Sequence, residues 1–176
     1  MLDFLSDSIH LVAITPDGPL DGKWFGSDRA AAEAWAIAQN AAARNIYFTV
    51  NVTSPHVKIK PKKEHINAVR FAHVDIDPPA TGDWDKDAAL LDLMERGAPS
   101  VIIDSGNGLQ ALWHLVDGST DVEDINRGIA HAFDADGSVH NIDRLFRVPG
   151  TTNFPDARKK ARGRSETVAS LLYVQP

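Results

Sequence analysis

The stretch Val74-Asp75-Ile76-Asp77-Pro78 ends an apolar run over residues 69–76, and it decides the expected fold. Side chains alternate between the two faces of a strand, so Val74 and Ile76 enter a core while Asp75 and Asp77 share the other face. Two adjacent carboxylates resist ionising together, and a divalent cation removes that cost. Mg²⁺ commonly combines one or two carboxylates with substrate phosphates. The pattern predicts a strand that ends in a metal site; the alternative is that the aspartates only end the strand beside prolines.

Strand and helix signals alternate along the whole chain without a repeat or a low-complexity linker, so one domain over residues 1–176 is expected. A strand over 9–14, a helix over 30–43 capped by Ser27 or Asp28, and a strand over 46–52 form an N-terminal strand-helix-strand unit. Further along, the patterns predict helices over 85–96 and 121–133 and strands over 100–103, 109–116, 144–148 and 171–174. The tight turn at 105–108 predicts a hairpin, which favours a mixed α+β sheet over an all-parallel one.

The composition excludes several classes of protein. The chain has 176 residues of which 43% are hydrophobic, which is enough for a core and argues against disorder. It has no cysteine, so disulfides, thiolate metal sites and thiol nucleophiles are excluded. It shows neither a signal peptide nor an apolar stretch long enough for a membrane span. A cytoplasmic protein without a membrane partner is therefore expected.

The net charge of −6 hides two basic segments. Residues 58–70 hold five basic side chains against one acidic, and residues 144–164 hold seven against one. The first segment contains Lys58, Lys60, Lys62 and Lys63, and the second ends in a polybasic run over 158–164. A solvated loop is the simplest interpretation of the first segment, and both segments require an explanation.

Two further segments carry candidate ligand-binding groups. The turn Ser105-Gly106-Asn107-Gly108 can direct backbone N–H groups and a hydroxyl at phosphate oxygens, with Gln110 close by; alternatively it is only a hairpin turn. In the segment 141–153, Asp143 can add a third carboxylate to the metal site, and Arg144 and Arg147 can hold phosphates. The alternative there is an Asp-Arg ion pair before a turn.

The three segments together resemble motifs I, II and III of the archaeo-eukaryotic primase (AEP) superfamily. The matching strings are Asp-Ile-Asp, Ser-Gly-Asn-Gly and Asp-Arg-Leu-Phe-Arg-Val-Pro-Gly-Thr-Thr-Asn, and the similarity runs from about Tyr47 to Asn153. The chain is most similar to the primase-polymerase domains of plasmid and phage replication proteins, including the RepB group. The resemblance implies an α+β fold with an RRM-like, mostly antiparallel central sheet and flanking helices. The N-terminal strand-helix-strand unit would be an extension of it.

The resemblance also implies a function. It implies template-directed nucleotidyl transfer from nucleoside triphosphates on single-stranded DNA, with Mg²⁺ or Mn²⁺ held by Asp75, Asp77 and Asp143. A helicase domain in the same chain or in a partner protein is a further implication, and the chain has the extent of a single primase-polymerase domain, whether whole or excised from a longer primase-helicase protein. The implied nucleotide-binding residues are Ser105, Gly106, Asn107, Gly108, Gln110, Arg144 and Arg147. The implied contacts to the DNA backbone are Lys58, Lys60, Lys62 and Lys63, and the run over 158–164 would be a second backbone contact or a link to a following domain.

One departure from the family keeps other functions open. The family often has a histidine where this chain has Gln110, and glutamine cannot carry a positive charge. A non-catalytic nucleic-acid-binding module on the same sheet is one alternative, and a metal-dependent nuclease is another. A tyrosine-nucleophile initiator is less attractive, because neither Tyr47 nor Tyr173 lies beside a His-x-His metal motif.

Overall fold

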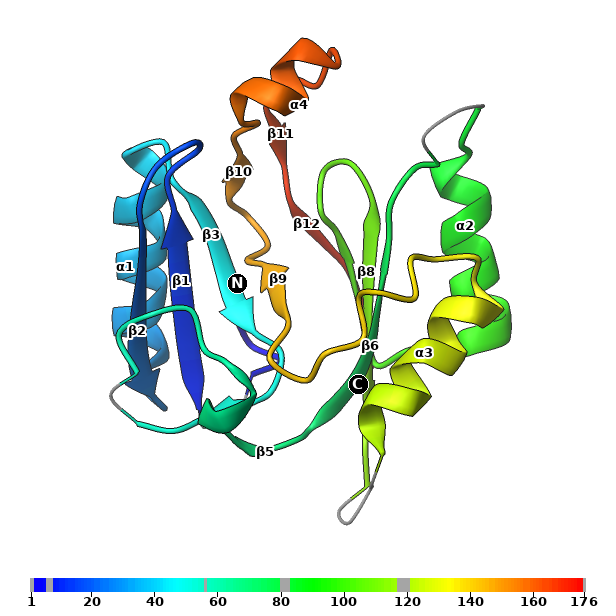
Figure 1. The fold of residues 1–176 in the computed structure, drawn as a ribbon, viewed down its shortest axis with the longest axis horizontal. Coiled ribbons are helices and arrows are strands. Elements are labelled where there is room, and N and C mark those ends of the chain that lie inside the picture. Colours follow the sequence, from blue (N-terminus) through cyan, green and yellow to red (C-terminus); the bar gives the residue numbers. More distant parts are fainter. Residues whose placement is uncertain (1, 6–7, 56, 80–82, 117–120, 176) are drawn as a thin grey trace.

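The computed structural model describes residues 2–5, 8–55, 57–79, 83–116 and 121–175, which form two four-stranded antiparallel sheets (Figure 1). The first sheet has the order β2-β1-β3-β9, from β1 (Ile9–Ile14), β2 (Leu20–Gly26), β3 (Asn45–Thr49) and β9 (Leu145–Arg147). The second has the order β12-β7-β8-β6, from β6 (Phe71–Ile76), β7 (Val101–Asp104), β8 (Leu109–His114) and β12 (Ser170–Val174). Two short pairs complete the strands: β4 (Val52–Thr53) with β5 (Ile66–Ala68), and β10 (Thr152–Asn153) with β11 (Thr167–Val168).

The longer helices cover the outer faces of the sheets. Figure 1 shows α1 (Arg29–Ala41) outside the first sheet, and α2 (Lys86–Asp92) and α3 (Val122–Ala132) outside the second. A π turn (Leu93–Gly97) continues α2, and two short helical elements are the 3₁₀ turn Lys63–His65 and α4 (Ala157–Ala161). None of the helices in the described residues has the length and apolar character that a bilayer span requires. The predicted α+β class with antiparallel sheets and flanking helices is confirmed.

The segment from β6 to α3 has the split β-α-β arrangement that the RRM-like prediction calls for. β8 lies between β6 and β7 and is antiparallel to both. Asp85 begins α2 by accepting hydrogen bonds from the backbone N–H groups of Asp87 and Ala88, each at 3.0 Å. The predicted hairpin is formed by β7 and β8 around the turn at residues 105–108.

The N-terminal unit contains one strand more than the sequence predicted. β2 pairs with β1 in a hairpin, so the unit is strand-strand-helix-strand, and α1 is capped by Asp28 as expected. β2 is an edge strand with two glycines and little buried apolar surface, so its pattern is weak. Gly22 is required there, because a Cβ atom would lie 2.3 Å from the carbonyl oxygen of Ile59. The loop that contains Ile59 is thereby held against the edge of the first sheet.

The two faces of β6 belong to different environments, as the alternation in its sequence predicts. Val74 and Ile76 are buried in the cluster that lies under α2 and α3. On the opposite face Phe71 joins the other cluster, together with Phe146 from the first sheet. Asp75 lies on this inner face, at the end of β6 where the two sheets meet.

Candidate functional site

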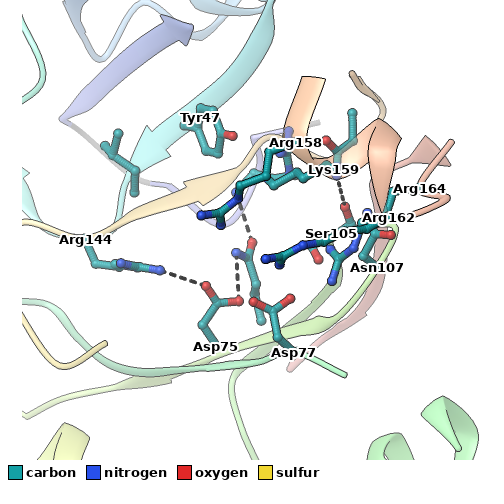
Figure 2. Close-up of a pocket in the computed structure, with 14 residues that line it drawn as sticks. Tyr47, Asp75, Asp77, Ser105, Asn107, Arg144, Arg158, Lys159, Arg162 and Arg164 are labelled. Atoms are coloured by element: carbon teal, nitrogen blue, oxygen red, sulfur yellow. Dashed lines mark hydrogen bonds and ion pairs between the residues drawn. The ribbon is translucent and has the colours of Figure 1, made fainter. Parts of the chain in front are cut away.

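A pocket of about 340 Å³ opens at the junction of the two sheets (Figure 2). This volume is in the range of small-molecule sites. The lining residues include six basic and two acidic side chains, so the pocket is strongly positive although the chain has a net charge of −6. They are Tyr47, Asp75, Asp77, Ser105, Asn107, Gln110, Arg144, Leu145, Arg147, Asn153, Arg158, Lys159, Arg162 and Arg164.

Asp75 is held by two donors on the inner face of β6. Its Oδ1 accepts a hydrogen bond from Gln110 Nε2 at 3.2 Å, and its Oδ2 accepts one from Arg144 Nη2 at 3.0 Å. The side chain is only 12% exposed. Burial raises the pKa of the Asp75 carboxyl, the Arg144 guanidinium acts against this by lowering it, and the charge of Asp77 raises it further. The Arg144 charge and the Gln110 hydrogen bond thus offset part of the cost of burying an ionised Asp75, and the pKa stays above its usual value.

Asp77 lies next to Asp75 at the end of the strand, and both point into the pocket in Figure 2. Asp143 does not line the pocket; its Oδ1 accepts a hydrogen bond from Asn141 Nδ2 at 2.6 Å. Within the described part of the chain, no three His, Cys, Asp or Glu side chains gather to form a metal cluster. Asp75 and Asp77 fit a divalent ion that is completed by phosphate oxygens and water, and in this structure the Asp143 carboxylate does not form a three-carboxylate cluster with them.

The two glycines of the β7–β8 turn pack closely against β6 and β11. A Cβ atom at Gly108 would lie 2.4 Å from the carbonyl oxygen of Ile76, and one at Gly106, which has a φ of +92°, would lie 2.1 Å from Thr167 Oγ1. Several polar groups are used within the turn. Ser105 Oγ donates to the Gly108 carbonyl and accepts from its N–H, both at 3.0 Å. The Gly106 N–H donates to Asp104 Oδ1 at 2.7 Å. Ser105 and Asn107 of this turn line the pocket.

Arg147 lies deeper in the pocket than Arg144. Its Nη1 donates a hydrogen bond to Asn45 Oδ1 at 3.0 Å, and its guanidinium lies 4.7 Å from the centre of the Tyr47 ring. Burial lowers the pKa of Arg147 and raises that of Tyr47. Both side chains are thus fixed by the first sheet, whereas Arg144 is tied to Asp75 of the second.

A basic arm, which we define as residues 156–164, lies over the pocket. It contains α4 and connects β10 to β11, which pair with each other. Asp156 caps α4 by accepting from the Lys159 N–H at 2.7 Å, and the Ala157 N–H donates to Asp17 Oδ2 at 2.8 Å. The sequence indicated a backbone contact or a linker here, and the structure brings four of its basic side chains into the pocket: Arg158, Lys159, Arg162 and Arg164. The basic arm reaches the pocket because the chain returns from it into β11 (Thr167–Val168), which pairs with β10. A strand of two residues gives no recognisable pattern in the sequence, so the sequence could not predict this position.

The lysine segment before β5 lies away from the pocket. In Figure 1 it is at the lower end of the molecule and α4 is at the upper end. Lys63 Nζ lies 2.7 Å from the carboxylate of Glu123 in α3, and Lys62 Nζ lies 3.9 Å from that of Glu64. Lys58 and Lys60 are exposed. The predicted DNA-binding lysines are therefore not part of the pocket.

Comparison with solved structures shows which fold this is. The crystal structure of primase RepB' matches 98% of this chain at 15% identity with a TM-score of 0.65. The catalytic domain of primase RepB' in complex with initiator DNA matches 96% at 16% identity, with a TM-score of 0.63 and 77% of that chain covered. The AEP domain of the cyanophage S-2L primase-polymerase matches 96% at 16% identity, with a TM-score of 0.61 and 82% covered.

These likenesses confirm the predicted fold. The chain has the fold of the AEP primase-polymerase domains of the RepB type, and it spans about half (54%) of the first of these structures. No protein-family model and no curated protein matches the sequence.

Proposed function

We propose that this chain is a primase-polymerase catalytic domain that transfers nucleotides from nucleoside triphosphates under the direction of a single-stranded DNA template. The observation that carries the proposal is the pocket, in which two carboxylates at the end of β6, those of Asp75 and Asp77, face six basic side chains. Phosphoryl transfer requires mainly positioning and the neutralisation of phosphate charge. A pocket with this distribution of charge offers both, and it lies on the fold of known primases.

The two aspartates would hold Mg²⁺ or Mn²⁺ together with phosphate oxygens of the nucleotide. A divalent ion bound there supplies positive charge to the phosphates and lowers the pKa of a hydroxyl group that it coordinates. Asp75 is oriented for this by Gln110 and Arg144, and Asp77 is exposed to the pocket.

In the proposed reaction, the terminal 3′-hydroxyl oxygen of the growing strand forms a bond to the α-phosphorus. The bond from this phosphorus to the oxygen that bridges to the β-phosphorus breaks, and pyrophosphate leaves while the hydroxyl proton passes to solvent. Negative charge accumulates on the leaving pyrophosphate. Arg158 and Arg162 of the basic arm are arranged to stabilise that charge, and Arg144 can pair with phosphate oxygens through its planar guanidinium.

The exposed lysines of the loop before β5 remain a proposed contact for the template. Lys58 and Lys60 have exposed side chains, and the loop that carries them is fixed to β2 by the hydrogen bond from the Gly22 N–H to the Lys58 carbonyl oxygen at 3.1 Å. A backbone contact of this kind gives affinity without sequence preference. The template would then extend from the pocket toward the lower end of the molecule as drawn in Figure 1.

The test is nucleotide incorporation by an Asp77→Asn variant. Labelled triphosphate, a primed single-stranded template and Mn²⁺ are incubated with the protein, and product lengths are measured on a gel. Removal of a group that only orients a metal ligand already costs about 10–100-fold, so we expect a loss of at least about 100-fold here. Glu95→Gln, which removes an exposed carboxylate outside the pocket, is the matched control and is expected to retain full activity.

Three results would contradict the proposed function. Wild-type activity in Asp77→Asn would show that this carboxylate is not needed for the reaction. Shortened labelled DNA in place of extended products would indicate a nuclease. Binding of DNA by the wild type without any nucleotide transfer would indicate a non-catalytic module.

A further inference from the structure

Gln110 joins two parts of the site that are not connected by any strand pairing. It lies on β8 directly opposite Asp75 in the β6–β8 ladder, and only 5% of the residue is exposed. Its Nε2 donates to Asp75 Oδ1 at 3.2 Å, and its Oε1 accepts from the backbone N–H of Arg147 at 3.0 Å. One amide therefore contacts the carboxylate of one sheet and the backbone of the other.

The second of these contacts gives a hydrogen-bond acceptor to a backbone N–H on an edge strand. Among the strands of the described residues, β9 is the last of the first sheet and pairs with β3 alone, so one side of its backbone has no neighbouring strand there. The Arg147 N–H points to that side and is buried. A buried backbone donor requires a partner, and Gln110 provides it. The same contact fixes the backbone at Arg147, whereas the guanidinium of Arg147 is held separately by Asn45 and the Tyr47 ring.

We propose that Gln110 is a positioning residue, which orients Asp75 and fixes β9 for the proposed nucleotidyl transfer, and that it does not bind the triphosphate. The inference rests on the proposed function for the role of Asp75. If Gln110 turned toward a phosphate, Asp75 Oδ1 would lose a donor and the Arg147 N–H would lose its acceptor. The positive charge for the phosphates is already available from the basic arm in the same pocket.

The first test measures triphosphate binding in EDTA, where no divalent ion contributes. A non-hydrolysable nucleoside triphosphate is titrated into wild type, Gln110→Met and Arg162→Gln by calorimetry. Gln110→Met removes both amide contacts at similar volume and is expected to bind the triphosphate within about twofold of wild type. Arg162→Gln removes a charge of the basic arm and is expected to bind about tenfold more weakly, as for the loss of one charge-assisted contact. A loss in Gln110→Met as large as in Arg162→Gln would make Gln110 a phosphate ligand and overturn the proposal.

The second test measures Mn²⁺ binding by electron paramagnetic resonance, without nucleotide or DNA. Groups that orient a metal-ligating carboxylate typically contribute 10–100-fold to affinity, so a loss of about tenfold or more is expected in Gln110→Met. Gln110→Asn is too short to reach both partners and is expected to behave in the same way, which covers the case that the methionine variant does not fold. Unchanged Mn²⁺ affinity in both variants would contradict the orienting role.

The third test does not depend on any activity. Hydrogen exchange of the Arg147 amide is followed by NMR, and exchange is expected to be faster in Gln110→Met than in wild type. Gln110→Glu keeps an acceptor for that amide and is expected to retain the wild-type protection. If the wild type binds Mn²⁺ but transfers no nucleotide, the proposed function fails, while this measurement still tests the contact between Gln110 and the Arg147 N–H. Equal protection in wild type and Gln110→Met would refute this contact, whether or not the protein is active.

Discussion

His73 makes the stability of this protein sensitive to mild acid. Its side chain is completely buried on the inner face of β6, where Nδ1 accepts a hydrogen bond from Asn126 Nδ2 at 3.2 Å and the ring lies edge-on to Phe146 at 5.4 Å. Burial lowers the pKa of His73 from 6.5 to about 3, and the charges of Arg144 and His140 lower it as well. The backbone of Val139 and the charge of Glu123 act in the opposite direction. The folded protein therefore holds this imidazole neutral.

The sign of the effect follows from the two pKa values. Between pH 6.5 and about 3 the unfolded chain carries a proton on His73 that the folded chain does not, so the free energy of unfolding falls as the pH is lowered through this window. Above pH 6.5 the contribution is constant. Each pH unit corresponds to about 1.4 kcal/mol, so His73 alone should destabilise the fold by roughly 2 kcal/mol between pH 7.5 and 5.0.

The assay is urea unfolding in EDTA at pH 7.5 and 5.0, for wild type and for His73→Gln. The variant is less stable at pH 7.5 because the ring contact with Phe146 is lost, but it has no titrating group at this position. All other titrating groups are shared, so the difference between the two proteins should shrink by about 2 kcal/mol at pH 5.0. Parallel losses of stability in the two proteins would refute the argument that a buried neutral His73 causes the sensitivity.

Two more predictions test the site and its surroundings. Gly108→Ala places a Cβ atom 2.4 Å from the Ile76 carbonyl oxygen and should lower the free energy of urea unfolding by about 1–3 kcal/mol. The matched control Gly128→Ala lies in α3 with open space around it and should raise that free energy by about 1 kcal/mol; a destabilised control or a neutral Gly108→Ala would contradict the close approach. Replacing Lys58 and Lys60 together by glutamine should reduce the salt dependence of single-stranded DNA binding, with the slope of log K against log salt changing by about 1.4. An unchanged slope would show that the loop does not contact the DNA backbone.

The sequence predicted the elements whose signals are local. The alternation in β6 placed Asp75 and Asp77 on one face, and the turn at 105–108 predicted the β7–β8 hairpin. The edge strand β2 was missed because an edge strand with two glycines buries little apolar surface and so has no clear period. Local patterns show which side chains of a strand share its buried face. They do not reveal a strand that is stabilised only by pairing with its neighbour, because such a strand has no buried face.

The parts of the site that the sequence did not predict depend on contacts between distant segments. The basic arm enters the pocket because two residues of β10 pair with two of β11. Gln110 has its amide engaged because β9, 37 residues further along the chain, approaches β8 from the other sheet. The sequence distance between β6 and Asp143 does not tell which way the Asp143 side chain points. In this structure the Asp143 carboxylate accepts a hydrogen bond from Asn141 and does not line the pocket.

The proposed function depends on the distribution of charge in this chain, and not on its sum. A chain of net charge −6 would repel a triphosphate on average, and at physiological ionic strength that average field is screened beyond about 8 Å. Inside the pocket the relevant balance is six basic side chains against two aspartates. Asp75 is already paired with Arg144, and Lys159 lies 4.0 Å from the carboxylate of Asp156. Arg147, Arg158, Arg162 and Arg164 supply the remaining positive charge of the pocket. The proposed ligand, a triphosphate that brings a divalent ion to Asp75 and Asp77, matches this balance of charge better than a simple anion does.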